Sequence, residues 1–178
     1  MEIIETPLAG LTCLVPRRFE DTRGYFLETH NAAHYQSIVG RPFVQDNLSH
    51  SRRGVLRGLH YQFPDWQGKL VFPISGEIFD VAVDLRPESA TRGQWYGVVL
   101  SARDHKQIYV PPGFAHGFCV LSETADVIYK CTAFYNPQCE FTLAWDDPTI
   151  AVKWPIKEPL MSPKDQKGRA FRDVFASV

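Results

Sequence analysis

Apolar residues along this chain occur in short runs. From Phe43 onward, nearly every run is bounded by Gly, Pro, Asp or Asn. This spacing predicts an all-β sandwich or barrel, because alternating strand–helix units would need longer stretches of helical periodicity. The clearest predicted strand runs from Glu77 to Leu85. Its residues alternate between two faces, one formed by Phe79, Val81, Val83 and Leu85 and the other by Ile78, Asp80, Ala82 and Asp84.

Helices are expected only at the periphery. Asn31 can cap one helix over Ala32 to Val39, which ends at Gly40. The sequence Ser-Pro-Lys-Asp at residues 162–165 has the Ser, Pro and acid that begin a short helix. The other apolar runs predict strands at Leu11 to Val15, Tyr25 to His30, Trp95 to Leu100, Gln107 to Val110, Gly117 to Leu121, Ala125 to Tyr135 and Phe141 to Trp145.

Together these elements predict one all-β domain of jelly-roll type with short peripheral helices. A length of 178 residues fits a single domain. We expect residues 1–50 to supply N-terminal strands and a short helix. Residues 51–146 are expected to form the jelly-roll core and residues 147–178 a C-terminal appendage.

Charge and cysteine content narrow the class of protein. Nineteen Lys and Arg side chains against twenty Asp and Glu leave a net charge of −1, so the chain has no charge footprint for nucleic acid or an anionic membrane. The four cysteines show neither CxxC nor zinc-finger spacing, which predicts free thiols and a reducing compartment. No signal-peptide pattern is present, and no apolar run approaches the ~18 residues of a membrane span. We therefore expect a cytoplasmic globular protein.

Two segments combine tight-turn residues with a histidine among apolar neighbours. Residues 54–62 (GVLRGLHYQ) contain Arg57 and His60, and residues 111–118 (PPGFAHGF) contain His116. The glycines on both sides of Arg57 suggest backbone that makes room for a ligand. We expect the two segments to form opposite walls of one cavity.

A metal site between these histidines is disfavoured. Metal ligands in a barrel typically lie at positions i and i+2 of one strand, so that both point inward. The residue two positions after His60 is Gln62, and no Glu follows at a useful distance. His116 alone cannot hold a metal. We therefore predict that the site contains none.

Proton transfer is the chemistry that remains. His60 could act as a general base, because an imidazole titrates near neutral pH. Lys69 begins a predicted strand, and Tyr129 could donate a proton if its hydroxyl faced the same cavity. A base, a cation and an acid around one pocket would suit proton removal next to a carbonyl. Each residue also has an ordinary structural interpretation, as a core histidine, a solvated lysine or a packed tyrosine.

Further motifs accompany these residues in a fixed order along almost the whole chain. They are residues 21–28 (DTRGYFLE), 44–49 (VQDNLS), 54–62, 68–71 (GKLV), 76–86, 112–121, 129–130 (YK), 134–137 (FYNP), 154–155 (WP) and 162–165 (SPKD). A single such motif would be weak, but the ordered set is highly specific. It resembles the dTDP-4-dehydrorhamnose 3,5-epimerase family, whose fold is a cupin-type jelly roll.

The resemblance implies a role for each matching residue. His60 would remove the protons that flank the ketone of the substrate, and Asp165 would orient His60. Lys69 would stabilise the enolate oxygen. Tyr129 would supply a proton from the opposite face, and Tyr135 would stack on the ligand. The other substrate-binding residues implied are Arg23, Glu28, Gln45, Asn47, Arg57, His116, Glu140 and Lys164.

The same resemblance implies partners and cofactors. The expected substrate is a dTDP-4-keto-6-deoxy-hexose, and neither a metal nor an organic cofactor is expected. The family forms homodimers that exchange N-terminal strands, so Arg23 and Glu28 are expected to serve the site of the partner. No nucleic acid or membrane partner is expected.

Three other functions stay open at this point. A single-position epimerase, acting at carbon 3 or carbon 5 only, would keep the same base and acid. A metal-dependent cupin is disfavoured by Gln62. A non-catalytic sugar-binding cupin is disfavoured by the joint presence of His60 and Tyr129.

Overall fold

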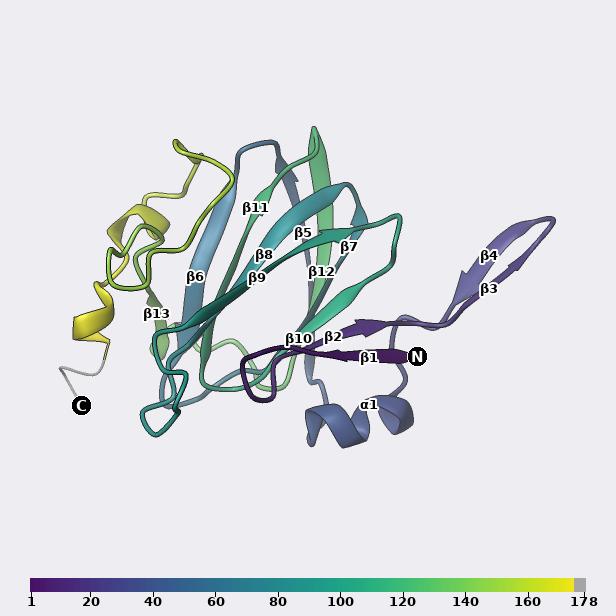
Figure 1. Cartoon of the computed structure of the whole chain (residues 1–178), viewed down its shortest axis with the longest axis horizontal. Coiled ribbons are helices and arrows are strands. Elements are labelled where there is room, and N and C mark those ends of the chain that lie inside the picture. The colour runs from purple at the N-terminus through teal and green to yellow at the C-terminus, as the bar shows by residue number, and fades with distance from the viewer. Residues whose placement is uncertain (175–178) are drawn as a thin grey trace.

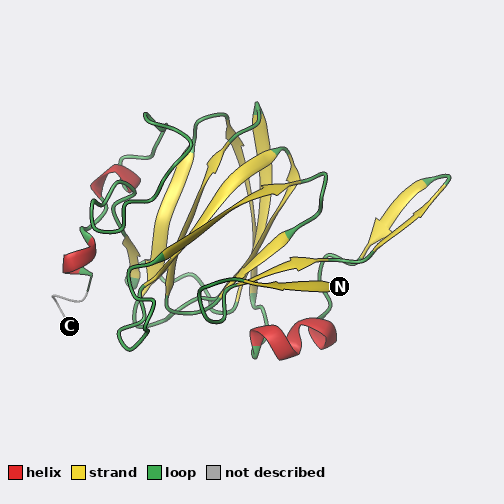
Figure 2. Ribbon diagram, in the orientation of Figure 1, coloured by secondary structure: helices red, strands yellow, loops and turns green. Residues whose placement is uncertain are grey.

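Two antiparallel sheets face each other in the structure, a computed structural model that describes residues 1–174 of the 178 (Figures 1 and 2). One sheet has the strand order β1 (Glu2–Glu5), β2 (Thr12–Val15), β10 (Gln107–Val110), β7 (Lys69–Ser75), β12 (Thr124–Cys131) and β5 (Gln45–Arg52). The other has the order β13 (Glu140–Thr142), β6 (Leu56–Gln62), β11 (Phe114–Val120), β8 (Glu77–Asp84) and β9 (Trp95–Ser101). The predicted all-β jelly roll is confirmed.

The main core lies between the two sheets, and a second core lies outside the five-stranded sheet. On β8, Ile78 and Ala82 face the six-stranded sheet, whereas Val81 and Val83 pack on the opposite side against Leu143 and the segment that follows it. That segment contains the 3-10 helices η1 (Asp165–Lys167) and η2 (Phe171–Asp173). The C-terminal segment therefore covers the outer face of this sheet, which explains why β8 is buried on both faces.

Helix α1 (Ala32–Val39) covers part of the outer face of the six-stranded sheet. Asn31 caps it as predicted, because its Oδ1 accepts a hydrogen bond from the Ala33 amide at 3.0 Å. Gly40 ends it with a left-handed φ of 72°. Tyr35 and Val39 pack from the helix onto this sheet. No helix in residues 1–174 is long and apolar enough to cross a membrane.

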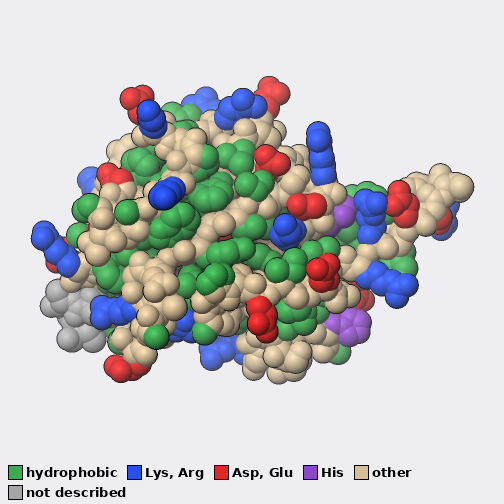
Figure 3. Space-filling model, viewed as in Figure 1, with side chains coloured by type: hydrophobic (Ala, Val, Ile, Leu, Met, Phe, Trp, Pro, Cys, Tyr) green, Lys and Arg blue, Asp and Glu red, His purple; other side chains and the backbone are tan. Residues whose placement is uncertain are grey.

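A hairpin of β3 (Arg18–Asp21) and β4 (Gly24–Leu27) stands clear of the globular body (Figures 1 and 3). Three large apolar side chains on it are mostly exposed, namely Phe19 at 51 %, Tyr25 at 57 % and Phe26 at 70 %. A two-stranded ribbon is marginally stable alone, and clustered exposed aromatics mark interaction surfaces. The hairpin therefore exposes a cluster of aromatic side chains that the rest of the described chain does not cover.

Strands β6 and β11 approach each other closely at two glycines. A Cβ built on Gly58 would lie 2.7 Å from the Cα of Gly117, and one on Gly117 would lie 2.5 Å from the carbonyl oxygen of Arg57. Gly58 also has a φ of 121°, which L side chains rarely adopt. These glycines let the strand with His60 and the strand with His116 lie against each other.

The structure departs from the sequence expectations at several strand ends. The strand predicted over Ala125 to Tyr135 ends at Cys131. There Thr132 turns away and exchanges hydrogen bonds with the backbone of Gly68. Strand β1 was not predicted, because its four residues are all exposed and show no apolar alternation. Residues 175–178 of the expected C-terminal appendage lie outside the described residues.

Candidate active site

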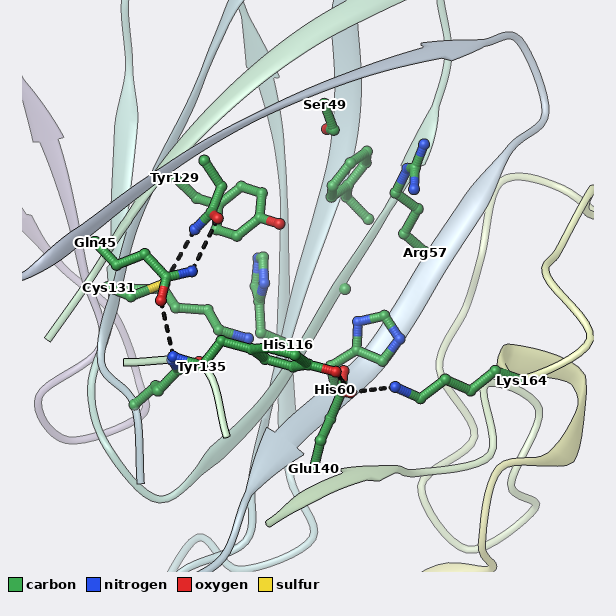
Figure 4. Close-up of a pocket in the computed structure, with 15 residues that line it drawn as sticks. Gln45, Ser49, Arg57, His60, His116, Tyr129, Cys131, Tyr135, Glu140 and Lys164 are labelled. Carbon is green, nitrogen blue, oxygen red and sulfur yellow. Dashed lines mark hydrogen bonds and ion pairs between the residues drawn. The ribbon is translucent and has the colours of Figure 1, made fainter. Parts of the chain in front are cut away.

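A cavity of about 370 Å³ opens between the two sheets (Figure 4). The six-stranded sheet contributes side chains from β5, β7 and β12, and the five-stranded sheet contributes side chains from β6, β11 and β13. The lining residues are Gln45, Asn47, Ser49, Arg57, His60, Gln67, Lys69, His116, Gly117, Phe118, Tyr129, Cys131, Tyr135, Glu140 and Lys164. Most residues that the sequence analysis selected therefore meet in one place.

His60 enters the cavity from β6 and pairs with Asp165 of the C-terminal segment. Its Nε2 lies 2.6 Å from the Asp165 carboxylate, whose side chain is only 6 % exposed. An ionised carboxylate only accepts hydrogen bonds, so the proton of the ring is held on Nε2 and Nδ1 is left as the basic atom. Asp165 is suited to orienting His60 in this tautomer.

The charge of Asp165 is maintained by its neighbours. Burial opposes ionisation of this carboxyl, but the interactions with His60 and the other hydrogen bonds together outweigh burial and lower the pKa of Asp165. The Ser162 hydroxyl and the Gly58 amide act in the same direction. Ser162 also accepts a hydrogen bond from the Asp165 amide at 3.1 Å. A short 3-10 helix follows as predicted, but its N-cap is Lys164 and not Ser162.

Lys69 contributes its ammonium group to the cavity. It is the first residue of β7, and its cross-strand neighbour on β12 is Cys131. No hydrogen bond or ion pair joins its ammonium to any residue in the described part of the chain. Burial lowers the pKa of Lys69, and nearby Cys131, Glu140 and Asp80 oppose that shift. Its N–H groups are therefore available to donate hydrogen bonds to an oxygen atom of a molecule in the cavity.

Tyr129 reaches the cavity from the sheet opposite His60. It lies on β12, whereas His60 lies on β6 (Figure 4). Burial raises the pKa of its phenol, with Cys131 adding to the shift. Within residues 1–174 its hydroxyl has no hydrogen-bond partner, so it can donate its proton to a bound molecule. An imidazole and a phenol therefore face the same space from two walls.

Polar residues at the edge of the cavity bind one another. The Tyr135 hydroxyl donates to Glu140 Oε2 at 2.6 Å, and Lys164 forms an ion pair with the same oxygen. Burial acts to raise the pKa of Glu140, but the bonds from Lys164 and Tyr135 bring it below its usual value. Gln45 Oε1 accepts from the Tyr135 amide at 2.8 Å, and Gln45 Nε2 donates to Asn47 Oδ1 at 2.9 Å.

Two glutamines hold the loop that carries Tyr135. Gln62 accepts a hydrogen bond from the Asn136 amide and donates to the Phe134 carbonyl, while Gln67 donates to the Ala133 carbonyl. Gln62, at the position where a barrel metal site would have its second ligand, therefore binds the backbone of the Tyr135 loop instead. In residues 1–174, no three His, Cys, Asp or Glu side chains lie together as a metal site. The expectation of a metal-free, cofactor-free site stays a prediction.

The expected placement of the two histidine segments on opposite walls is wrong. Strands β6 and β11 are neighbours in one sheet, and His116 is the direct cross-strand partner of His60. Both side chains therefore lie on the same wall, which is possible because Gly58 and Gly117 let the strands approach. The opposite wall is formed by β5, β7 and β12.

Arg23 and Glu28 do not reach this cavity in the single chain. Arg23 sits in the turn of the hairpin, 87 % exposed, and pairs with Asp21 at 2.6 Å. Glu28 pairs with His34 beside helix α1. Arg57 does line the cavity, where its Nε donates to Ser51 Oγ at 2.9 Å. The structure thus separates two of the expected binding residues from the rest.

The chain matches a known protein family over almost its whole length. Residues 5–173 match the family model described as dTDP-4-dehydrorhamnose 3,5-epimerase. The chain belongs to the dTDP-4-dehydrorhamnose 3,5-epimerase family. The resemblance seen in the sequence motifs is confirmed.

The chain is similar to individual members of this family over nearly its whole length. The dTDP-4-dehydrorhamnose 3,5-epimerase of Shigella flexneri is 48 % identical, with 98 % of each chain covered. That of Neisseria gonorrhoeae is 51 % identical over 100 % of this chain, which spans only 55 % of that relative's length. A crystal structure of a dTDP-6-deoxy-D-glucose-3,5-epimerase from Legionella pneumophila, in complex with dTDP-4-keto-L-rhamnose, superposes with a TM-score of 0.94 at 47 % identity. It covers 98 % of this chain and 95 % of that chain. The cupin-type fold is shared with these epimerases.

Several lining residues of the epimerase site were missed from sequence alone. Ser49 follows Gln45 and Asn47 on alternate positions of β5, so the period of two would have found it once the strand was recognised. Polar residues on both faces hid that strand. Gln67 and Cys131 carry no pattern that separates them from structural residues. Asp80 was placed on a β8 face, but nothing in the sequence shows what it binds.

Proposed function

We propose that this chain is a dTDP-4-dehydrorhamnose 3,5-epimerase, which converts dTDP-4-dehydro-6-deoxy-D-glucose to dTDP-4-dehydro-L-rhamnose. The observation that carries the proposal is the convergence of His60, Tyr129 and Lys69 on one cavity, with the first two on facing sheets. Inverting a carbon requires proton removal on one face of the sugar and proton return on the other. A base and an acid on opposite walls meet that requirement.

The substrate ketone makes the reaction feasible. Hydrogens on carbons 3 and 5 are acidified by the carbonyl at carbon 4, because the carbanion formed at either position delocalises as an enolate. In this proposal Nδ1 of His60 takes the proton and the Lys69 ammonium stabilises the oxygen on which charge develops. One well-placed donor of this kind contributes roughly 3–4 kcal/mol to the transition state. Tyr129 then returns a proton from the other face.

Asp165 acts through His60 and is a positioning residue. The remaining cavity residues bind substrate in this proposal. Arg57 and Lys164 offer cations for the diphosphate, and Tyr135 offers a ring for the thymine. Gln45, Asn47, His116 and Glu140 supply hydrogen bonds to the nucleotide sugar. The proposed reaction needs no metal or organic cofactor. A cytoplasmic location is expected because the four cysteines are free, as is usual in a reducing compartment.

Solvent deuterium incorporation tests the double epimerisation. We expect the chain, incubated with the keto-sugar in deuterated water, to place deuterium at both carbon 3 and carbon 5 of the product, as measured by mass spectrometry and proton NMR. Incorporation at one carbon alone would show a single-position epimerase. No incorporation, with dTDP still bound, would show a sugar-binding protein.

We also propose a homodimer in which the hairpin of one chain completes the site of the other. The exposed aromatics of the hairpin and the distance of Arg23 from its own cavity support this arrangement. In this arrangement the partner chain covers Phe19 and Phe26, and Arg23 binds the substrate in the cavity of the partner chain.

Mixing two defective variants tests the exchange. Arg23→Ala and His60→Ala homodimers are each expected to have low activity. Refolded together in equal amounts, they should regain about one quarter of wild-type activity, because half of the dimers are mixed and one site in each is intact. If Arg23 served its own chain, every site in the mixed dimer would carry a defect and activity would not rise.

A further inference from the structure

A buried acid lies behind the cavity wall and is not part of the proposed chemistry. Asp80 is on β8, on the face that points between the two sheets, and its side chain is 0 % exposed. The neighbours on that face of β8 are the apolar Ile78 and Ala82. A carboxylate is almost never fully buried unless it is paired, because removing it from water is costly.

His116 is the group that compensates Asp80. Its Nε2 lies 3.0 Å from Oδ1 and 2.9 Å from Oδ2 of Asp80. No other side chain within residues 1–174 donates a hydrogen bond to this carboxylate. Since the carboxylate only accepts, Nε2 of His116 carries a proton, and Nδ1 is the nitrogen that remains for a ligand.

His116 faces the substrate cavity beside the proposed base. It lines the cavity with 8 % of its side chain exposed, and on β11 it is the direct cross-strand partner of His60. Directly paired residues of an antiparallel ladder project to the same side. The wall therefore carries two histidine–carboxylate pairs, His60 with Asp165 and His116 with Asp80.

The two pairs are chemically different. Asp165 binds a histidine that is 29 % exposed, and its carboxylate also accepts from Ser162 and Gly58. Among residues 1–174, Asp80 has His116 as its one hydrogen-bonding side chain, and Ile78 and Ala82 beside it on β8 are apolar. The imidazolium form of this ring makes a charge-assisted pair with the carboxylate through Nε2, and in that form Nδ1 is also a donor. A donor is useful where an oxygen becomes negative during the reaction.

We propose that Asp80 is a positioning residue for the epimerase reaction. Asp80 holds His116 as a charged hydrogen-bond donor to the oxygen on carbon 4 of the substrate. The inference rests on the proposed epimerase activity. Lys69 lines the same cavity from the opposite sheet, and its ammonium interacts electrostatically with the Asp80 carboxylate. Asp80 thus offsets the positive charge that two neighbouring donors bring into the cavity before the enolate forms.

The test is Asp80→Asn, which keeps the shape and the acceptor oxygen but removes the charge. We expect kcat for the epimerisation to fall by roughly 10- to 100-fold, somewhat less than the loss of a complete oxyanion donor. KM and dTDP affinity should be nearly unchanged, because the lost interaction is made mainly in the transition state. His116→Gln should give a similar loss, and the double variant should be no slower than His116→Gln alone.

Asp84→Asn is the matched control. Asp84 is another fully buried acid on β8, but it is held by Arg86, Ser89 and Thr91 outside the cavity. Its loss should lower the melting temperature and leave kcat intact. If Asp80→Asn also lowered only the melting temperature, Asp80 would be structural and the inference overturned. Should Asp80→Asn not fold, an unchanged kcat in His116→Gln would overturn it equally. A wild-type chain that exchanges no deuterium would instead refute the epimerase proposal itself.

Discussion

Replacing His60 with alanine is expected to abolish deuterium incorporation at carbons 3 and 5 while dTDP still binds. The expected loss is at least about 10³-fold, within the range for removing a general base. Binding should survive because the diphosphate and thymine contacts proposed above do not involve the imidazole. Single-turnover exchange in deuterated water and calorimetric titration with dTDP measure the two effects separately.

Tyr129→Phe is the informative comparison for this variant. It removes only the hydroxyl on the opposite wall, so His60 can still take a proton and give it back on the same face. Exchange should therefore persist in part while inversion is lost. Near wild-type exchange in His60→Ala would assign the base to another residue. Full inversion in Tyr129→Phe would remove the phenol from the mechanism.

The second large effect is expected for Lys69→Met. Methionine retains most of the length of the side chain and fits the apolar β7 position, but it brings no charge. We expect kcat to fall by about 10²- to 10³-fold, the usual effect of removing a donor to a developing oxyanion. The melting temperature should stay the same or rise, because burial of an unpaired ammonium is relieved.

Lys130→Met provides the control for Lys69→Met. Lys130 is the adjacent strand lysine, but it pairs with Asp46 at 2.7 Å and does not line the cavity. Its loss should change neither kcat nor KM appreciably. An unaltered kcat in Lys69→Met would place the stabilising charge elsewhere in the cavity.

Much of the fold followed from local sequence patterns. The helix over Ala32 to Val39 was predicted to the residue, because Asn31 and Gly40 fix its ends by local geometry. The strand at Gln107–Val110 was predicted equally well. The period of two could not give the strand order, since β6 and β11 are brought together by contacts distant in sequence. That is why His60 and His116 were assigned to opposite walls.

The candidate site shows the same division. His60, Lys69 and Tyr129 could be selected by residue type and strand position, and the family motifs added Asp165. The partner of His116 could not be found, because an acid on an alternating strand has the same pattern whether it faces solvent or a histidine. Arg23 is a different case. In the proposed homodimer it contacts the cavity of the partner chain, so the structure of a single chain cannot show what it binds.

The C-terminal segment after β13 has two structural roles. It covers Val81 and Val83 with apolar side chains such as Ile150, and it also brings Asp165 to His60. Backbone bonds between Arg169 and Thr142 and Ala144 fasten it to β13 and the residues just beyond. If this segment detached, His60 would lose its hydrogen bond to Asp165 even if both sheets stayed folded. In the proposed mechanism, proton abstraction therefore depends on the docking of residues 144–174. Weakening that docking at an apolar residue remote from the cavity, such as Ile150, is expected to lower activity without changing a residue that lines the cavity.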